Sequence, residues 1–222
     1  MRLILASSSP RRRALLSLLQ LPFDVVEPDD VEEPHPDLDP AALTALYAER
    51  KAQSCADRFP DCLVLGGDTL IALEGKRKSK ARTEVLGKPT DLVEARAMLH
   101  RLRGQEHTIH TAVALICQRD RVADLASEQV RVWMRHFSDA EVEAYLRTQE
   151  SLGKAGAYSI QGEGAHLIEA IQGDFTAAVG LPLRLVAGLL LRRGIRAPVE
   201  VGRIYREKPF PNWAKFSPQK SG

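Results

Sequence analysis

Short apolar segments of strand length alternate with helical segments along this chain, and this alternation limits the fold more than any other feature. Near the N-terminus, the strand-like segment Leu3–Ala6 is followed by a helical segment over 10–20 and an extended stretch over 23–28. A helix over 40–58 then precedes the long apolar run Leu63–Leu73. Strands that alternate with helices favour an α/β protein built around a sheet.

The second half of the chain continues this alternation and contains two helix-boundary signals. Ser138–Glu141 reads SDAE, the capping-box pattern of a helix start, and Gly194 follows an apolar helical run as a stop signal. The expected elements are a helix over 89–103, strands over 107–117, 121–137 and 167–171, and a helix over 180–194.

Three segments of polar or proline-rich composition are expected to lie outside the core. Residues 29–40 are acidic and rich in proline, residues 75–84 form a basic insert, and the residues after Pro198 contain three further prolines. We expect loops in the first two segments and weak order in the third. The predicted organisation is one domain over 1–197 and a C-terminal tail over 198–222.

The composition argues against several classes of protein. With 222 residues, of which 44% are hydrophobic, the chain can bury a sizeable core. A net charge of +2 gives no global field that would attract nucleic acids. Cys55, Cys62 and Cys117 form no CxxC pair, which argues against a disulfide framework or a zinc site. Because no apolar run suits a signal peptide or a membrane span, we expect a soluble cytoplasmic protein with no membrane partner.

The segment Ser7–Arg13 reads SSSPRRR and comes directly after the first strand-like segment. Ser9 and Pro10 suit the N-cap and the first position of a helix. Three arginines at this place face the positive end of the helix dipole, which disfavours cations. A bound anion would offset this repulsion, because backbone N–H groups, hydroxyls and guanidinium groups together suit phosphate oxygens.

Further polar residues lie beside glycines at expected strand ends and turns, where α/β proteins tend to bind ligands. Asp68 follows two glycines, which suggest a bulge or the close approach of a ligand. Lys88 lies in a GKP turn, and Gln161 lies in a glycine-rich segment and offers both a donor and an acceptor. Each has a structural alternative: an Asx turn at Asp68, a solvated turn lysine at Lys88 and a simple hairpin around Gln161. Lys51, in AERKA, is by itself typical of a solvated helix lysine.

Taken together and in this order, the motifs SSSPRRR, AERKA, LGGDT, LGKP, GKAGAYSIQG and GLPL resemble the Maf family of nucleoside triphosphate pyrophosphatases. The resemblance extends from about Leu3 to Arg193. It implies an elongated α/β fold of the Maf/ITPase type, with a twisted mixed sheet flanked by helices and two lobes around a central cleft. It also implies hydrolysis of a nucleoside triphosphate between the α and β phosphates, with a divalent metal, in nucleotide-pool sanitation.

The resemblance assigns roles to individual residues. Asp68 matches the proton acceptor, while Lys51 and Lys88 match lysines that neutralise the leaving pyrophosphate. Glu33 is the expected second carboxylate, so Glu33 and Asp68 are the implied ligands of a metal, and such hard oxygen donors suit Mg²⁺ or Mn²⁺. The implied substrate-binding residues are Ser8, Arg11 and Arg12 for the triphosphate, with Arg11, Thr69 and Gln161 as specificity positions.

Within the family, the sequence IQG after GAYS resembles the branch that prefers dTTP and UTP. Three departures bear on base preference and metal geometry: Gly153 replaces the usual aspartate before KAGAY, TAAV replaces an asparagine-bearing run, and the insert over 75–84 is longer and more basic than usual. The alternatives are a 7-methyl-GTP or inosine triphosphate pyrophosphatase, and a non-enzymatic regulator of septum formation that binds nucleic acid. A homodimer is a further expectation, since members of the family are commonly dimeric.

Overall fold

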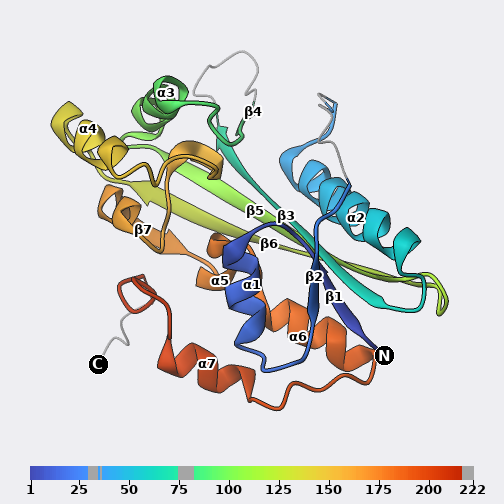
Figure 1. The fold of residues 1–222 in the computed structure, drawn as a ribbon. Helices are drawn as coiled ribbons and strands as arrows, with labels where there is room; N and C mark the ends of the chain where they lie inside the picture. The colour runs from blue at the N-terminus through green and yellow to red at the C-terminus, as the bar shows by residue number, and fades with distance from the viewer. Residues whose placement is uncertain (30–34, 36, 75–82, 217–222) are drawn as a thin grey trace. The chain divides into compact units, whose positions relative to one another are not determined.

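The computed structural model describes residues 1–29, 35, 37–74 and 83–216. Within these residues, strands and helices follow one another in the predicted alternation (Figure 1). The strands are β1 (Leu3–Ala6), β2 (Asp24–Val26), β3 (Leu63–Glu74), β4 (Thr83–Leu86), β5 (Glu106–Cys117), β6 (Val122–Met134) and β7 (Ile168–Gln172). The α-helices are α1 (Pro10–Ser17), α2 (Pro40–Arg58), α3 (Leu92–Leu102), α4 (Asp139–Arg147), α5 (Phe175–Val179), α6 (Leu183–Arg192) and α7 (Val201–Glu207), and the short 3-10 helices are η1 (Ala155–Ala157) and η2 (Glu163–Leu167).

The strands of the described residues form one mixed sheet of seven strands. Their order is β2-β1-β3-β5-β6-β7, and β4 pairs with β3 off this path. Strand β1 is parallel to both β2 and β3, whereas β4 is antiparallel to β3 and β7 is antiparallel to β6. The predicted α/β class and mixed sheet are therefore confirmed.

The chain divides into two compact units, and β3, β5 and β6 contribute residues to both. Unit 1 contains Met1–Thr69, His110–Glu128 and Gly180–Glu207. Unit 2 contains Leu70–Ile109, Gln129–Val179 and Lys208–Gly222. The cleft between two lobes that the family resemblance implies stays a prediction.

Helix α2 packs against the strands of unit 1 through small side chains. Its N-cap is Asp39, whose side chain accepts a hydrogen bond of 2.9 Å from the N–H of Ala42. Its buried face packs in a core cluster with residues of strands β1, β3 and β5. The cluster comprises Ala48, Ala52, Cys55 and Ala56 of α2, Ile4 and Ala6 of β1, Val64 of β3, Ala112, Ala114 and Ile116 of β5, and Cys62. Small side chains on both sides bring the helix backbone close to the sheet.

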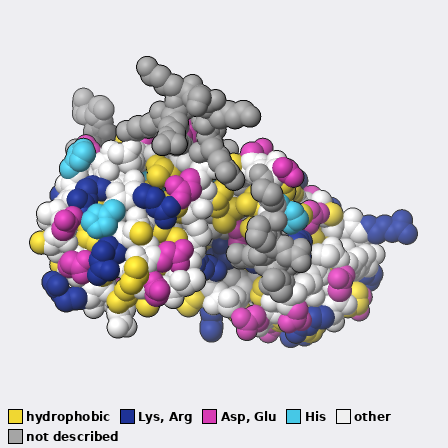
Figure 2. Space-filling model, turned by 90° about the horizontal axis from the view of Figure 1, so that it is seen from above, with side chains coloured by type: hydrophobic (Ala, Val, Ile, Leu, Met, Phe, Trp, Pro, Cys, Tyr) yellow, Lys and Arg dark blue, Asp and Glu magenta, His cyan; other side chains and the backbone are white. Residues whose placement is uncertain are grey.

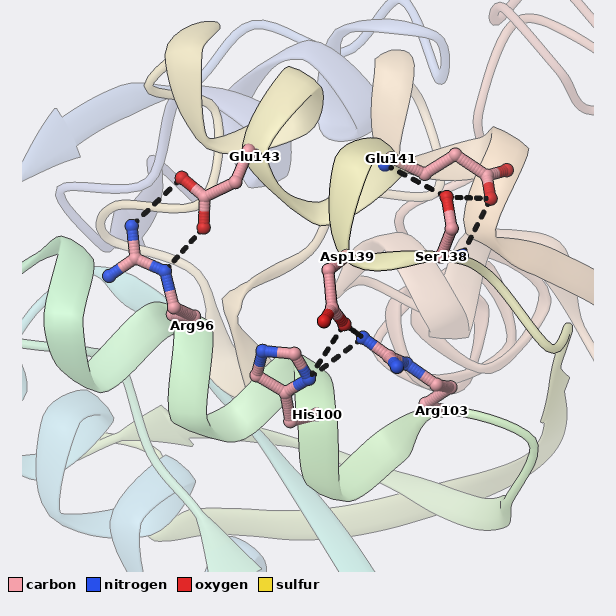
Figure 3. A network of polar contacts seen from close by, with 7 residues as sticks. All are labelled: Arg96, His100, Arg103, Ser138, Asp139, Glu141 and Glu143. Carbon is pink, nitrogen blue, oxygen red and sulfur yellow. Dashed lines mark hydrogen bonds and ion pairs between the residues drawn. The ribbon is translucent and has the colours of Figure 1, made fainter.

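In unit 2, helices α3 and α4 are joined by exposed ion pairs (Figure 3). The guanidinium of Arg96 donates two hydrogen bonds, of 2.5 and 2.9 Å, to Glu143, and Arg103 donates one of 2.5 Å to Asp139. These hydrogen bonds lower the pKa of both carboxyl groups. Ser138 and Glu141 form the capping box that the sequence predicts at the start of α4.

Two expectations from the sequence are wrong. The residues after Pro198 are not weakly ordered over 198–216, because α7 forms there and Trp213, only 3% exposed, stacks on Phe175. The glycines before Asp68 do not interrupt β3, which runs from Leu63 to Glu74. Most of the acidic run and of the basic insert lies outside the described residues.

None of the helices within the described residues is both long enough and apolar enough to cross a membrane.

Candidate active site

The first part of the candidate site is the start of α1, where the chain leaves β1. Ser9 is the predicted N-cap, and its side chain accepts from the N–H of Arg12. Buried Ser7 accepts a hydrogen bond of 3.1 Å from the N–H of Ser9. Ser8 is exposed and, with Arg13 and Ser17 of α1 among other residues, lines an open hollow of about 330 Å³. The hydroxyl-rich turn is therefore preorganised at a helix N-terminus, as the sequence predicts.

The guanidinium of Arg12 is held in place by two partners in unit 1. Its Nε donates to the carbonyl of Gly180 at 2.9 Å, and its Nη2 donates to Oγ1 of Thr69 at 3.1 Å. The hydroxyl of Thr111 donates to the same Thr69 oxygen at 3.1 Å. Thr69, predicted as a specificity position, thus lies between Arg12 and Thr111 in this structure.

Lys51 and Asp68 form a buried ion pair in unit 1. Nζ of Lys51 lies 2.6 Å from Oδ1 of Asp68, and the two residues are 9% and 5% exposed. The ammonium also lies 5.9 Å from the centroid of the Tyr47 ring, within the range of a cation–π contact. Lys51 is therefore not a solvated helix lysine, and the structural alternative for it is wrong.

The second oxygen of Asp68 has no such partner. Oδ2 is buried and accepts no hydrogen bond from any described residue. A buried carboxylate oxygen without a partner is costly, so an ordered water or a bound group is needed to satisfy it. A proton or a divalent cation would satisfy it.

Gly66 fixes the approach of α2 to β3. A Cβ atom at this position would lie 2.5 Å from the carbonyl oxygen of Ala48 and 2.6 Å from the nitrogen of Ala52. The glycine therefore serves the packing of the helix that carries Lys51. The bulge predicted at Gly66 is wrong, because Gly66 pairs in register with Ala6 of β1, whereas a ligand contact there stays a prediction.

Unit 2 contains the other two described candidates, Lys88 and Gln161. Lys88 is exposed in the turn between β4 and α3, and the preceding Gly87 carbonyl accepts a hydrogen bond of 3.0 Å from the N–H of Gly156. This bond brings the LGKP and KAGAY motifs together. Gly156 has φ +66 and Gly153 has φ +69, so both lie in the left-handed region that glycine adopts readily.

A buried pair supports the glycine-rich segment from within unit 2. Nε2 of His107 and the hydroxyl of Tyr158 share a hydrogen bond of 2.8 Å, and burial lowers the pKa of His107 to about 4. Burial also raises the pKa of Tyr158. The imidazole is therefore neutral at physiological pH and acts as part of the core.

Glu33, the predicted second carboxylate, lies outside the described residues. Within the part of the chain that the structure covers, no three His, Cys, Asp or Glu side chains are grouped as a metal site. The Asp68 carboxylate, with its unpartnered Oδ2, nevertheless fits one ligand of Mg²⁺ or Mn²⁺, because such ions often use one or two carboxylates and complete their shell with phosphate oxygens and water.

The Maf-like protein family matches residues 2–193. The chain belongs to this family. The family resemblance predicted from the sequence motifs is thus confirmed, and the match covers β1 to α6 of this Maf-like chain.

Several relatives of this Maf-like chain are named dTTP/UTP pyrophosphatase. The protein of that name from Pelotomaculum thermopropionicum is 40% identical over 86% of this chain and 96% of its own length. The one from Moorella thermoacetica is 42% identical over 87% of this chain and 96% of its own length. The one from Symbiobacterium thermophilum is 42% identical over 86% of this chain and 94% of its own length.

Two residues of the site were missed by the sequence analysis. Thr111 lies on β5 and contacts Thr69 on the neighbouring β3, a pairing without a local sequence signal. Gly180 has φ +122, and a Cβ there would lie 3.3 Å from Oγ1 of Thr69. Its place at the start of the GLPL motif was the one indication in the sequence that Gly180 belongs to the site.

Proposed function

We propose that this protein hydrolyses dTTP and UTP to the nucleoside monophosphate and pyrophosphate. The observation that carries the proposal is the buried Lys51–Asp68 ion pair, in which Oδ2 of Asp68 has no partner among the described residues. The chain that contains this pair is 40% identical to a relative named dTTP/UTP pyrophosphatase. The reaction needs a proton acceptor and positive charge near a phosphate chain. Asp68 and the cationic side chains of unit 1 supply both.

In the proposed reaction, the oxygen of a water molecule attacks the α-phosphorus. The bond between the α-phosphorus and the bridging oxygen breaks, and this oxygen leaves with pyrophosphate. The proton of the water passes to the carboxylate of Asp68, which Lys51 holds by its other oxygen, Oδ1. No covalent bond between protein and substrate forms.

The arginines at the start of α1 are proposed to contact the triphosphate. Arg12 is oriented by Gly180 and Thr69, so little conformational entropy is lost when it meets a phosphate oxygen. An anion at this position would also offset the repulsion between Arg11, Arg12 and the helix dipole.

A divalent cation is the proposed cofactor. As the alternative to accepting the proton itself, Asp68 would hold through Oδ2 the Mg²⁺ or Mn²⁺ that activates the water, with Glu33 as the second ligand. Such an ion stabilises negative charge on phosphate oxygens.

The face shown in Figure 2 gives no support to nucleic-acid binding. On the face shown in Figure 2, the Lys and Arg side chains of the described residues are interspersed with Asp and Glu. A general nucleic-acid binder instead gathers its basic side chains along one stripe or patch.

The test is steady-state release of pyrophosphate from dTTP, UTP, dCTP, ITP and 7-methyl-GTP, with Mg²⁺, with Mn²⁺ and with a chelator. We expect dTTP and UTP to have the highest kcat/KM and the chelator to abolish turnover. Preference for ITP or 7-methyl-GTP would contradict the proposed substrate, and no turnover with any nucleotide would contradict the proposed activity.

A further inference from the structure

The C-terminal segment, residues 208–216, packs on the loop that contains Gln161, residues 159–165. We call these the C-terminal segment and the Gln161 loop. The match to the Maf-like family ends at residue 193. The alignments with the three relatives above include 94–96% of each relative but only 86–87% of this chain. The C-terminal segment is thus an addition to the matched family region.

Asn212 connects the C-terminal segment to both sides of Gln161. Its Nδ2 donates one hydrogen bond of 3.1 Å to the carbonyl of Ile160 and another of 3.1 Å to the carbonyl of Gly162. Because both partners are acceptors, the NH₂ end of the amide must face the loop. These two bonds hold the peptide group between Ile160 and Gln161 and the peptide group between Gly162 and Glu163, and so constrain the direction in which the Cα–Cβ bond of Gln161 points.

The C-terminal segment has anchors of its own beside Asn212. The ring of buried Trp213 stacks on Phe175, with centroids 5.1 Å apart and an angle of 11° between the planes. Nζ of Lys215 donates to the carbonyl of Ala165 at 2.7 Å. These contacts anchor the residues that directly follow Asn212, and so help to hold its amide in place.

Gln161 itself is available to a ligand. Its side chain is half-buried and forms no hydrogen bond with any described residue. A side-chain amide presents a donor and an acceptor, which can pair with the O2, N3–H and O4 edge of uracil or thymine. Such readout discriminates between bases only when the amide is held in one orientation.

We propose that Asn212 is a positioning residue for base recognition, which holds Gln161 oriented toward the edge of a uracil or thymine base. This inference rests on the proposed function for its substrate. It goes beyond that function by assigning a specificity role to a segment outside the matched family region.

The decisive variant is Asn212→Asp. Aspartate keeps the size of the side chain and tolerates the positive φ of +64, but it turns carboxylate oxygens toward two carbonyl oxygens. The matched control is Gln149→Glu, which makes the same chemical change at an exposed residue of unit 2 with φ +58. Thermal unfolding confirms that each variant folds, and Asn212→Ala replaces Asn212→Asp if the aspartate variant does not.

The readout is the ratio of kcat/KM for dTTP to kcat/KM for dCTP. We expect this ratio to fall roughly 5- to 30-fold in Asn212→Asp, the effect of losing one or two hydrogen bonds. Since Asn212 acts through Gln161, the same change made in a Gln161→Ala background should not lower the ratio further. Gln149→Glu should leave it unchanged. An equal loss on both nucleotides, or an effect that adds to that of Gln161→Ala, would overturn the inference.

A second measurement does not depend on activity. Amide hydrogen exchange over 159–165, without nucleotide, should be faster in Asn212→Asp than in wild type and in Gln149→Glu. If wild type were inactive on every nucleotide, the proposed function and the base-reading role would both fail, and faster exchange would still support the bracing of the loop. If wild type preferred dTTP and Asn212→Asp kept both that preference and slow exchange, the inference alone would fail.

Discussion

At the residue scale, the two oxygens of Asp68 have different surroundings. Oδ1 lies 2.6 Å from the ammonium of Lys51, and Oδ2 is buried without a partner among the described residues. The pair keeps the carboxylate in one orientation, and Oδ2 is the oxygen that we propose takes part in the reaction.

Replacing Asp68 by asparagine should separate turnover from binding. Asp68→Asn preserves the shape of the side chain but removes its proton-accepting capacity, so kcat should fall roughly 10²–10⁴-fold. KM should change little, because the cationic groups that attract the triphosphate remain. Steady-state pyrophosphate release from dTTP measures both constants, and circular dichroism checks the fold.

The control is Asp61→Asn, which removes the charge of an exposed carboxylate paired with Arg119. Its kcat should match that of wild type. A folded Asp68→Asn enzyme with nearly unchanged kcat would exclude Asp68 as the proton acceptor and direct attention to Glu33.

His107 makes the stability of the protein depend on pH. Burial lowers its pKa from 6.5 to about 4, so the folded protein binds fewer protons than the unfolded chain between these values. The stabilisation that neutral His107 allows is complete above pH 6.5 and is lost as pH falls toward 4. At about 1.4 kcal/mol per pH unit, the loss is about 3 kcal/mol.

Urea unfolding of wild type and His107→Gln at pH 7.5 and pH 4.5 checks this expectation. The free energy of unfolding of wild type should fall by about 2–3 kcal/mol more than that of the variant between the two pH values. The exposed His166→Gln variant serves as the control and should behave like wild type. Equal pH dependence in wild type and His107→Gln would show that the imidazole is not buried as a neutral group.

At the element scale, the contact between α2 and β3 positions the Lys51–Asp68 ion pair. Lys51 lies on the helix and Asp68 on the strand, and both flank the place where Gly66 meets Ala48 and Ala52. The distance between helix and strand therefore sets the distance between ammonium and carboxylate.

Gly66→Ala should both destabilise the protein and lower its activity. The new Cβ would overlap helix backbone atoms, which cannot rotate away as a side chain can, so the helix must shift. Overpacking of this kind costs roughly 1–3 kcal/mol. Thermal unfolding and pyrophosphate release measure the two effects.

The matched control is Gly188→Ala in α6, also in unit 1, where a Cβ would meet no atom within 4 Å. Alanine in a helix should there raise stability by up to about 1 kcal/mol. A Gly66→Ala variant with the same stability as wild type would contradict the packing role of Gly66.

At the scale of the whole molecule, residues 194–222 extend beyond the region matched to the family, and the basic insert lies within it. The residues after 193 form α7 and the C-terminal segment, which contribute buried Ile204 and Trp213. Residues 75–82 of the basic insert lie outside the described residues, and the loop predicted over 75–84 is wrong at Thr83 and Glu84, which belong to β4. Thr83 is the direct partner of Glu74 in the antiparallel β3–β4 pairing.

Replacing residues 75–82 by Asn-Gly should leave catalysis little changed. The paired ends can be joined by a two-residue turn, and the insert has a polar composition with no apolar period to pack on a core. Pyrophosphate release and thermal unfolding of the shortened protein measure the effect. A full-length variant in which the Lys and Arg residues of the insert are changed to Gln separates the effect of charge from the effect of length. Complete loss of turnover in a shortened variant that folds would contradict the prediction.

Local interactions could be predicted from the sequence, because the residues that form them are close along the chain. The N-cap at Ser9, the capping box at Ser138 and the helix from Pro40 to Arg58 follow from backbone and side-chain groups within four residues of one another, and the alternation of strands and helices follows from apolar periodicity. The ordered list of motifs was sufficient to identify the family.

Only the tertiary structure decided which distant residues meet. The packing role of Gly66 was not predicted because its neighbours, Ala48 and Ala52, lie on another element, and nothing in the local sequence distinguishes a glycine that packs from one that binds. Asn212 lies in a proline-rich stretch that suggested weak order, yet it bonds to carbonyls fifty residues away. Backbone carbonyls occur at every residue and leave no mark on the sequence, so a contact with them becomes visible only when the chain has folded.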